Sequence, residues 1–346
     1  MAKIKVGILG SNGYVGYELV RLLLNHKEVE LQYLSSRANK GKKYYEIYPS
    51  VYSRLDLEFE DVDINKCLDL DLLFCATPHG FSADFITKDL LDKVKIIDLS
   101  ADFRLKNADV YKQYYKKEHN AKELLKDAVY GLCEIHREDI KAAKFIANPG
   151  CYTTCSILSL YPLLKEKLID ENFIIIDAKS GVSGAGREAK SDNLFCEVNE
   201  NFKAYALSSH RHTPEIEQEL SLAFKSDIKV QFTPHLVPIQ KGILSTSYTK
   251  LKDNLNENEL REIYAKYYDK EYFIRLLPSE ILPQTKFTRG TNFVDINLKL
   301  DERTGNLIIL ASLDNLIKGA AGQAIQNMNL LFGFDEKLGL ENLSMI

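Results

Sequence analysis

Residues 3–25 read KIKVGILGSNGYVGYELVRLLLN. The part up to Leu9 is short and apolar, as a buried strand is, and from Tyr14 onward apolar residues recur at helical spacing. Glycines stand at positions 7, 10, 13 and 16. A strand, a glycine turn and a helix in this order let the backbone approach a pyrophosphate, whose charge the helix N-terminus receives. The spacing is not G-x-G-x-x-G, so a glycine turn that only packs tightly stays open as an alternative.

The predicted nucleotide loop comprises Gly10, Ser11, Asn12, Gly13, Tyr14, Val15 and Gly16. A second strand is predicted at residues 30–34, and Ser36 and Arg37 follow it. NAD sites usually carry Asp or Glu about 20 residues after the glycine loop, where the carboxylate holds the ribose 2′-hydroxyl. A hydroxyl and a guanidinium suit a 2′-phosphate instead, so the sequence favours NADP.

Further buried strands are predicted at residues 71–76, 94–99 and 144–147. Because strands alternate with helical segments, we expect a parallel, doubly wound sheet whose ligands lie beyond the carboxyl ends of the strands. His79 and Arg104 both follow such strands. His79 is interpreted either as a turn histidine or as a catalytic group, and Arg104 either as an anion ligand or as a partner of Asp102.

Cys151 follows Asn148, Pro149 and Gly150 at the end of the last of these strands. Residues 152–164 are predicted to form a helix, which Pro162 ends or kinks. A cysteine at a strand-to-helix turn lies near the free N–H groups of the helix, and the helix dipole favours its thiolate. The position therefore favours a nucleophile; the alternative is a small apolar residue packed at a turn.

The sequence pattern changes after Cys151. A strand at residues 173–178 enters a second glycine-rich loop, and residues 256–270 have the pattern of an amphipathic helix. Later segments alternate apolar with polar residues, as half-buried antiparallel strands do, at 230–232, 244–249, 293–298 and 307–312. The sequence thus predicts an α/β protein: a Rossmann-type domain at 1–150, completed by a C-terminal helix at about 318–346, and an α+β domain with a mostly antiparallel sheet at 151–317.

His210 and His212 lie in a loop that leads into a predicted helix. Thr213 is the expected N-cap, Pro214 the first helical residue and Glu215 a first-turn acid. A histidine near neutrality can take the proton of a thiol and return one to a substrate oxygen, and we expect Glu215 to orient and charge-stabilise the His210 imidazole. Two alternatives stay open: a metal site of His-x-His plus a carboxylate, and two surface histidines before a capped helix.

Composition excludes several classes of protein. The 346 residues are 45% hydrophobic and 27% charged, which is typical of a globular chain with room for two cores. The formal charge of −4 gives no reason to expect nucleic acid as a partner. No apolar run reaches the roughly 18 residues of a membrane span. The 6 cysteines lack paired spacing, which indicates reduced thiols and a cytoplasmic protein.

Taken together, the motifs resemble those of N-acetyl-γ-glutamyl-phosphate reductase, a member of the acyl-phosphate and semialdehyde dehydrogenase superfamily. They are GSNGYVG at 10–16, DLSADFR at 98–104, NPGCY at 148–152, SGVSGAGR at 180–187 and HRHTPE at 210–215. The resemblance covers the full length of the chain. In its length, the chain looks like the longer type of the family. The NPGCY and HRHTPE motifs are highly specific, whereas many dehydrogenases share the glycine loop.

The resemblance implies an NADPH-dependent reduction of an acyl phosphate in arginine biosynthesis, by a homo-dimer or homo-tetramer assembled through the sheet of the middle domain. Cys151 would attack the acyl phosphate, expel phosphate and form a thioester, which hydride would reduce to the semialdehyde through a hemithioacetal. His210 would act as the acid and base, with Glu215 supporting it. The implied substrate contacts are Arg104, Asn148, Arg211 and His212. The implied contacts on the nicotinamide side are Pro78, Ser180, Gly181, Gly184 and Asn315.

Two other functions remain to be weighed. The first is the same chemistry on aspartyl phosphate or an aminoadipyl phosphate, because one methylene changes binding by only about 1–3 kcal/mol. The second is a nucleotide-sensing module that keeps the fold but catalyses nothing. The presence of Cys151, His210 and Glu215 together argues against the sensor.

Overall fold

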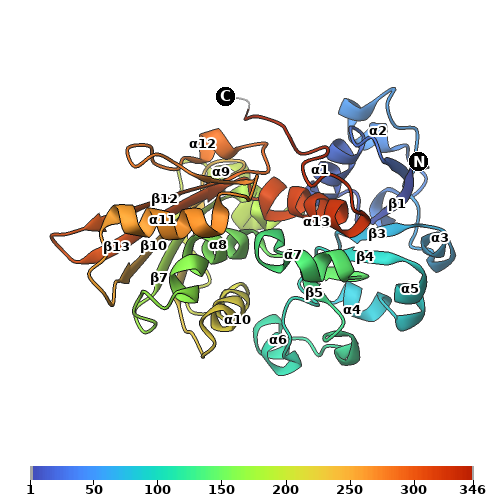
Figure 1. The fold of residues 1–346 in the computed structure, drawn as a ribbon. Coiled ribbons are helices and arrows are strands. Elements are labelled where there is room, and N and C mark those ends of the chain that lie inside the picture. Colours follow the sequence, from blue (N-terminus) through green and yellow to red (C-terminus); the bar gives the residue numbers. More distant parts are fainter. Residues whose placement is uncertain (1–2, 345–346) are drawn as a thin grey trace. The chain divides into compact units, whose positions relative to one another are not determined.

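The computed structural model describes residues 3–344, which fall into two compact units. Unit 1 comprises Met1–Pro149 with Ala320–Glu341, and unit 2 comprises Gly150–Gly319 with Asn342–Ile346. Figure 1 labels most of the elements of both units. The predicted domain ranges begin at residue 1 and end at residue 346, and residues 1–2 and 345–346 lie outside the described residues.

Unit 1 is built on a parallel sheet in the strand order β2-β1-β3-β4-β6-β5. Its strands are β1 (Ile4–Leu9), β2 (Val29–Ser35), β3 (Leu72–Cys75), β4 (Lys95–Asp98), β5 (Val129–Tyr130) and β6 (Phe145–Ala147). The order reverses beside β1, which has β2 on one side and β3 on the other. Doubly wound sheets bind ligands at the carboxyl ends of strands at such a switch point. The predicted parallel sheet is confirmed; β5 was not foreseen, because it has only 2 residues.

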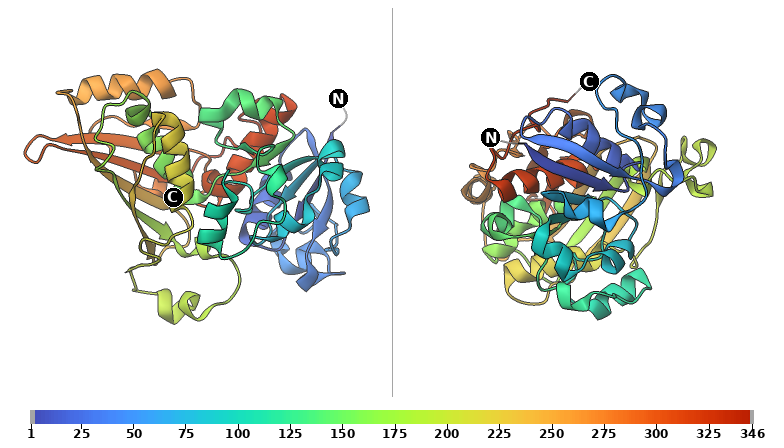
Figure 2. Two further views of the ribbon diagram at one scale, coloured as in Figure 1. Left: turned by 90° about the horizontal axis from the view of Figure 1, so that it is seen from below. Right: turned by 90° about the vertical axis from the view of Figure 1, so that its right-hand side faces the viewer.

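Helices surround this sheet. They are α1 (Tyr14–Leu23), α2 (Tyr44–Ile47), α3 (Ile64–Leu68), α4 (Phe81–Phe85), α5 (Lys88–Lys93), α6 (Ala108–Tyr115), α7 (Cys133–Ala142) and α13 (Gly322–Phe332). The last helix packs against α7 and α1 (Figures 1 and 2). The predicted helix at about 318–346 was too long. A π-helical turn, Ile317–Ala321, precedes α13, and Gly333 ends it in the left-handed region at φ +69°.

Unit 2 contains a mixed sheet in the order β11-β12-β13-β10-β7-β9-β8, whose pairs are mostly antiparallel, as predicted. Its strands are β7 (Ile175–Gly181), β8 (Lys203–Ala204), β9 (Gln231–Val237), β10 (Ile243–Lys250), β11 (Ile274–Leu276), β12 (Val294–Asp301) and β13 (Asn306–Leu313). Its helices are α8 (Cys151–Lys165), α9 (Phe195–Val198), α10 (Thr213–Phe224), α11 (Glu257–Tyr268) and α12 (Thr285–Thr288). Helix α8 packs on β10 and β13 and contacts α10 and α11 (Figure 1).

Pro162 does not end α8, which continues to Lys165. Proline lacks an N–H, so the carbonyl of Leu158, four residues earlier, loses its helical donor. The Tyr268 hydroxyl, from the end of α11, donates to that carbonyl at 2.6 Å. A side chain of a distant segment thus replaces the lost bond and allows the helix to continue.

Thr213 is the first residue of α10 and not its N-cap, which corrects the prediction. His212 is the N-cap, with φ −81° and ψ −14°, and its carbonyl accepts the N–H of Ile216 at 3.0 Å. The His212 N–H, one of the donors that a helix start leaves without a helical partner, donates to His210 Nδ1 at 3.1 Å. Pro214 accordingly stands at the second helical position.

Candidate active site

Two glycines of the loop in unit 1, Gly10 and Gly16, lie so close to neighbouring backbone that a Cβ would not fit. Gly10 has φ +76°, and a Cβ there would lie 2.3 Å from the Ala76 carbonyl oxygen at the end of β3. A Cβ on Gly16 would lie 2.6 Å from the Gly10 carbonyl oxygen. Gly13 is the N-cap of α1 and supplies no side-chain cap. The loop therefore forms a narrow backbone cradle at the helix N-terminus, which suits a phosphate.

The end of β2 carries groups that suit a 2′-phosphate. Ser36 is 6% exposed, and its hydroxyl has no hydrogen-bond partner within residues 3–344. Arg37 follows at the surface. A buried hydroxyl without a partner is costly, and a ligand oxygen at this edge would satisfy it. The residues present therefore fit NADP(H).

Buried carboxylates shape the loops after β3 and β4. Asp102 accepts the N–H groups of Gly80 at 2.6 Å and Ala83 at 3.0 Å, which fixes the loop that contains Pro78 and His79. Burial raises the pKa of the neighbouring Asp98 to about 6.

Arg104 and Asn148 both hold the end of β6. The Arg104 guanidinium donates to the backbone carbonyls of Asn148 at 2.8 Å and Leu99 at 3.0 Å, and the side chain is 8% exposed. The Asn148 amide donates to the Ala320 carbonyl at 3.2 Å and accepts from Asn327 at 3.0 Å. These bonds fix the backbone just before Pro149. A contact of either residue with substrate stays a prediction.

In unit 2, Cys151 is the first residue of α8, after Gly150 as N-cap with φ −73° and ψ 155°. Its side chain is half-buried, and Gly319 packs against it: a Cβ on Gly319 would lie 2.7 Å from the Cys151 Cβ. The sulfur thus lies at a helix N-terminus, where the dipole favours a thiolate. The predicted strand-to-helix turn is the one observed.

Glu215 bonds to the turn that carries Cys151. Its carboxylate is 1% exposed and accepts the Gly150 N–H at 2.8 Å and the Thr153 hydroxyl at 2.9 Å. Through space its negative charge partly opposes the lowering of the His210 pKa, which burial dominates. The hydrogen bonds to the first turn of α8 were not foreseen, because no sequence spacing links residue 215 to residue 150.

His210 lies in an aromatic cage. Its ring meets Tyr152 edge to face at 5.6 Å, with Tyr205 and Phe232 at 5.4 and 5.3 Å. The pKa of His210 is lowered to about 2, mainly by burial and further by the charges of His212 and Arg211. The ring is therefore neutral at physiological pH. Because Nδ1 accepts the His212 N–H, we place the proton of the neutral ring on Nε2.

Tyr205 is a residue that the sequence did not single out. Its hydroxyl lies 3.4 Å from His210 Nε2 and donates to the Tyr152 hydroxyl at 3.4 Å, and Tyr152 donates to the His235 carbonyl at 2.9 Å. Burial raises the pKa of Tyr205 to about 12, so it stays protonated. Its segment carries no periodic or motif signal that would have drawn attention to it.

The second glycine loop and Asn315 form one assembly. Asn315 donates to the Ser183 hydroxyl at 3.0 Å and accepts the Gly242 N–H at 2.8 Å. A Cβ on Gly184 would lie 3.3 Å from the Ser180 hydroxyl, and a Cβ on Gly181 would lie 2.8 Å from two backbone carbonyl oxygens. The structure thus brings Ser180, Gly181, Gly184 and Asn315 together. Of the other two predicted substrate contacts in unit 2, Arg211 is exposed and His212 half-buried.

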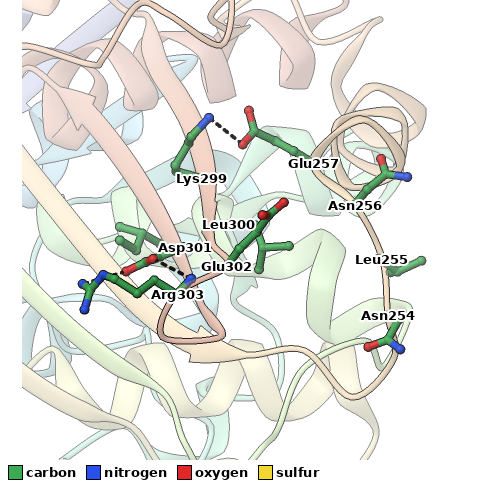
Figure 3. Close-up of a pocket in the computed structure, with 10 residues that line it drawn as sticks. Asn254, Leu255, Asn256, Glu257, Lys299, Leu300, Asp301, Glu302 and Arg303 are labelled. Atoms are coloured by element: carbon green, nitrogen blue, oxygen red, sulfur yellow. Dashed lines mark hydrogen bonds and ion pairs between the residues drawn. The ribbon is translucent and has the colours of Figure 1, made fainter.

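A hollow of about 950 Å³ lies elsewhere in unit 2 (Figure 3). It is lined by residues 254–257, 299–303 and 308, around the hairpin of β12 and β13. Its charges are largely paired within the chain, for example Lys299 with Glu257 at 2.9 Å. None of the predicted site residues lines it. Over residues 3–344, no cluster of three His, Cys, Asp or Glu side chains suits a metal, and no helix is long and apolar enough to cross a membrane.

Both parts of the chain match models of known protein families. Residues 5–143 match the semialdehyde dehydrogenase NAD binding domain, and residues 151–315 match the semialdehyde dehydrogenase dimerisation domain. N-acetyl-gamma-glutamyl-phosphate reductase of Campylobacter jejuni subsp. doylei is 61% identical over 98% of both chains, and that of Lachnoclostridium phytofermentans is 54% identical over 99% of both.

Solved structures show the same fold. Aspartate semialdehyde dehydrogenase II of Vibrio cholerae, in complex with ASA, aligns with a TM-score of 0.75 at 18% identity over 96% of this chain and 99% of that one. The Candida albicans aspartate semialdehyde dehydrogenase with NADP aligns with a TM-score of 0.68 at 17% identity. The alignment covers 95% of this chain and 98% of that one. The resemblance inferred from the motifs is confirmed: the chain belongs to the N-acetyl-γ-glutamyl-phosphate reductase family of semialdehyde dehydrogenases.

Proposed function

We propose that this chain reduces N-acetyl-γ-glutamyl phosphate to N-acetylglutamate 5-semialdehyde with NADPH and releases phosphate, in arginine biosynthesis. The observation that carries the proposal is the position of Cys151 at the N-terminus of α8, in one unit with His210 and Glu215. Two relatives named N-acetyl-gamma-glutamyl-phosphate reductase, which are 61% and 54% identical to this chain over nearly its whole length, support the same reaction.

Cys151 would be the nucleophile. Its thiolate attacks the acyl carbon, the bond from that carbon to the phosphate oxygen breaks, and phosphate leaves with the bonding pair. The carbon is then held as a thioester. NADP(H), when bound, supplies the hydride that takes this carbon to the aldehyde level. The carbon–sulfur bond then breaks and restores the thiolate, which the helix N-terminus favours.

His210 would act from its Nε2 edge. In the neutral tautomer Nε2–H donates, so it suits the oxygen that gains negative charge when the thiolate adds. The Tyr205 hydroxyl faces the same Nε2 edge at 3.4 Å, so the substrate oxygen would share this donor with Tyr205. Glu215 is a positioning residue for the Cys151 turn, and Arg104 and Asn148 position the backbone before it. Arg211 and His212 are the candidates for the phosphate or carboxylate of the substrate.

NADP(H) would be held by the glycine loop, residues 10–16, at its pyrophosphate and by Ser36 and Arg37 at its 2′-phosphate. Pro78, Ser180, Gly181, Gly184 and Asn315 are proposed for the nicotinamide side. Replacing Arg37 with Glu should lower the preference for NADPH over NADH, measured as the ratio of the two kcat/KM values. An unchanged ratio would remove Arg37 from the site.

We propose that the protein forms a homo-dimer or homo-tetramer in the cytoplasm. The subunits would associate through one face of the unit 2 sheet. Strand register places Ile308, Tyr248 and Ile175 in one row and Leu310 beside Thr246 in the next, and all are only half-buried. Leu310→Glu should reduce the mass seen by analytical ultracentrifugation. The matched variant Leu222→Glu, at an exposed position of α10, should leave the mass unchanged.

The proposed reaction is tested in its reverse direction. N-acetylglutamate 5-semialdehyde, NADP⁺ and phosphate should together yield NADPH, and omission of phosphate should stop turnover. If only aspartate semialdehyde or only an aminoadipyl semialdehyde is oxidised, the chemistry stands and the substrate is wrong. If no semialdehyde is oxidised while NADPH binds, the chain is a nucleotide sensor.

A further inference from the structure

The peptide groups of the glycine loop are fixed from one side by tyrosines of a later segment. The Tyr44 hydroxyl donates to the Ser11 carbonyl at 3.0 Å, and the Tyr48 hydroxyl donates to the Asn12 carbonyl at 2.7 Å. Tyr44 begins α2 and Tyr48 directly follows it. The backbone that would meet a pyrophosphate is thus bonded to a segment more than thirty positions away in sequence.

These two bonds orient the loop N–H groups. The described chain has no cis peptide, so each carbonyl points away from the N–H of the next residue. With the Ser11 carbonyl directed at Tyr44, the Asn12 N–H is directed to the opposite side. With the Asn12 carbonyl held by Tyr48, the Gly13 N–H closes the turn onto the Gly10 carbonyl at 3.2 Å. The Ser11 and Asn12 carbonyl oxygens, which would repel a phosphate, are thus directed at the two tyrosine hydroxyls.

The tyrosines are themselves held rigidly. Tyr44 is fully buried and packs against Phe59 at 4.8 Å and Tyr48 at 5.3 Å. Tyr17, on the first turns of α1, stacks on Tyr48 at 4.6 Å and bonds the Ser50 hydroxyl at 2.9 Å. Loop, helix and tyrosine segment therefore form one packed cluster, so the loop is preorganised before a ligand arrives.

We propose that Tyr44 and Tyr48 are positioning residues for the pyrophosphate of the dinucleotide: their hydroxyls hold the Ser11 and Asn12 carbonyls away from it. This inference rests on the proposed placement of the pyrophosphate at the glycine loop. A single hydrogen bond contributes about 0.5–1.5 kcal/mol net, which corresponds to about a two-fold to twelve-fold change in affinity.

The test is the Tyr48→Phe variant, with Tyr45→Phe as the matched control. Tyr45 neighbours Tyr44, its ring meets Tyr52, and its hydroxyl makes no hydrogen bond with residues 3–344. By fluorescence titration, Tyr48→Phe should raise the Kd of NADPH and of NADH by the same factor, about five-fold. The Kd of 2′-AMP, which lacks a pyrophosphate, and kcat at saturating NADPH should not change. Tyr45→Phe should match the wild type in all four measurements.

Two results overturn the proposal: an unchanged Kd for NADPH in Tyr48→Phe, or an equal loss of affinity for 2′-AMP, which indicates a merely structural role. A separate variant tests the underlying placement. Ala at Gly13 meets only the Gly10 carbonyl, at an ordinary 3.6 Å, so the fold tolerates it. If Gly13→Ala leaves the NADPH Kd unchanged while Tyr48→Phe raises it, the pyrophosphate lies elsewhere and the placement fails independently.

Discussion

Glu215 stabilises the turn that carries Cys151 but does not favour the thiolate by charge. Its carboxylate accepts the Gly150 N–H and the Thr153 hydroxyl, both at the start of α8. A negative charge at this position opposes a neighbouring thiolate, while the hydrogen bonds fix the backbone on which the sulfur is mounted. The contribution of Glu215 is therefore geometric.

Two substitutions separate these effects. Glu215→Ala leaves the buried Gly150 N–H without an acceptor, which should cost about 1–3 kcal/mol of unfolding free energy and lower kcat. Glu215→Gln keeps an oxygen acceptor and removes the charge, so kcat should stay within a few-fold of wild type. Denaturant unfolding and steady-state rates measure both. A large loss of kcat in the Gln variant would instead assign Glu215 a charge role toward His210.

His210 makes stability depend on pH. Its pKa is lowered to about 2 in the fold, chiefly by burial, against 6.5 for a free histidine side chain. Below pH 6.5 the unfolded chain therefore binds a proton that the folded chain does not, so stability falls as pH falls. At pH 5 this amounts to at most about 2 kcal/mol. The unfolding free energy of His210→Gln should decline less between pH 7 and pH 5; an equal decline would contradict the lowered pKa.

At the level of single residues, positions in the chain could be predicted and contacts could not. The turn before α8 that carries Cys151 and the loop before α10 that carries His210 follow from local sequence patterns, while their catalytic roles stay predictions. The bonds of Arg104 to backbone carbonyls, and the hydroxyl of Tyr205 beside His210, depend on tertiary packing alone. No pattern in the local sequence encodes them.

Helix α8 shows how an element depends on its neighbours. Pro162 removes one helical hydrogen bond, and Tyr268 of α11 supplies a donor to the Leu158 carbonyl. The carbonyl that Pro162 leaves without a helical donor is thus satisfied from α11. The sequence predicts that Pro162 ends or kinks the helix, and it cannot reveal the compensating hydroxyl, which lies 110 positions away.

Tyr268→Phe should therefore destabilise unit 2. It removes a hydroxyl from a side chain that is 4% exposed and leaves a buried carbonyl unpaired, at a cost of about 1–3 kcal/mol. Tyr267→Phe is the matched control, because its hydroxyl bonds the solvent-accessible Glu166. Denaturant unfolding should show a clearly smaller loss for the control. Equal losses would mean that the Leu158 carbonyl needs no donor.

Helix α13 is buried on all sides, because every residue from Gly322 to Leu331 is buried. Its polar residues Gln323, Gln326, Asn327 and Asn329 are as fully buried as its apolar ones. Asn327, for example, bonds Asn148 and the Gly131 carbonyl. An amphipathic pattern would assign such polar residues to the solvent, whereas here a hydrogen-bond network satisfies them in the interior.

On the scale of the whole molecule, the residues proposed for the 2′-phosphate and pyrophosphate and those proposed for the reaction belong to different units. Unit 1 holds the glycine loop with Ser36 and Arg37, and unit 2 holds Cys151 with His210. The parallel and the mostly antiparallel sheets could be predicted because buried parallel strands are continuously apolar and half-buried antiparallel strands alternate. The two-residue strands β5 and β8 could not, because so short a segment has no period.

The central claim is that Cys151 holds the substrate as a thioester, and a burst experiment tests it most directly. With N-acetylglutamate 5-semialdehyde and NADP⁺ but no phosphate, the thioester has no acceptor and accumulates. Stopped-flow absorbance should show a burst of about one NADPH per subunit, followed by resumed turnover when phosphate is added. Cys151→Ser should bind NADPH and give no burst. A full burst in Cys151→Ser, or linear NADPH formation without a burst in the wild type while phosphate is absent, would contradict the account.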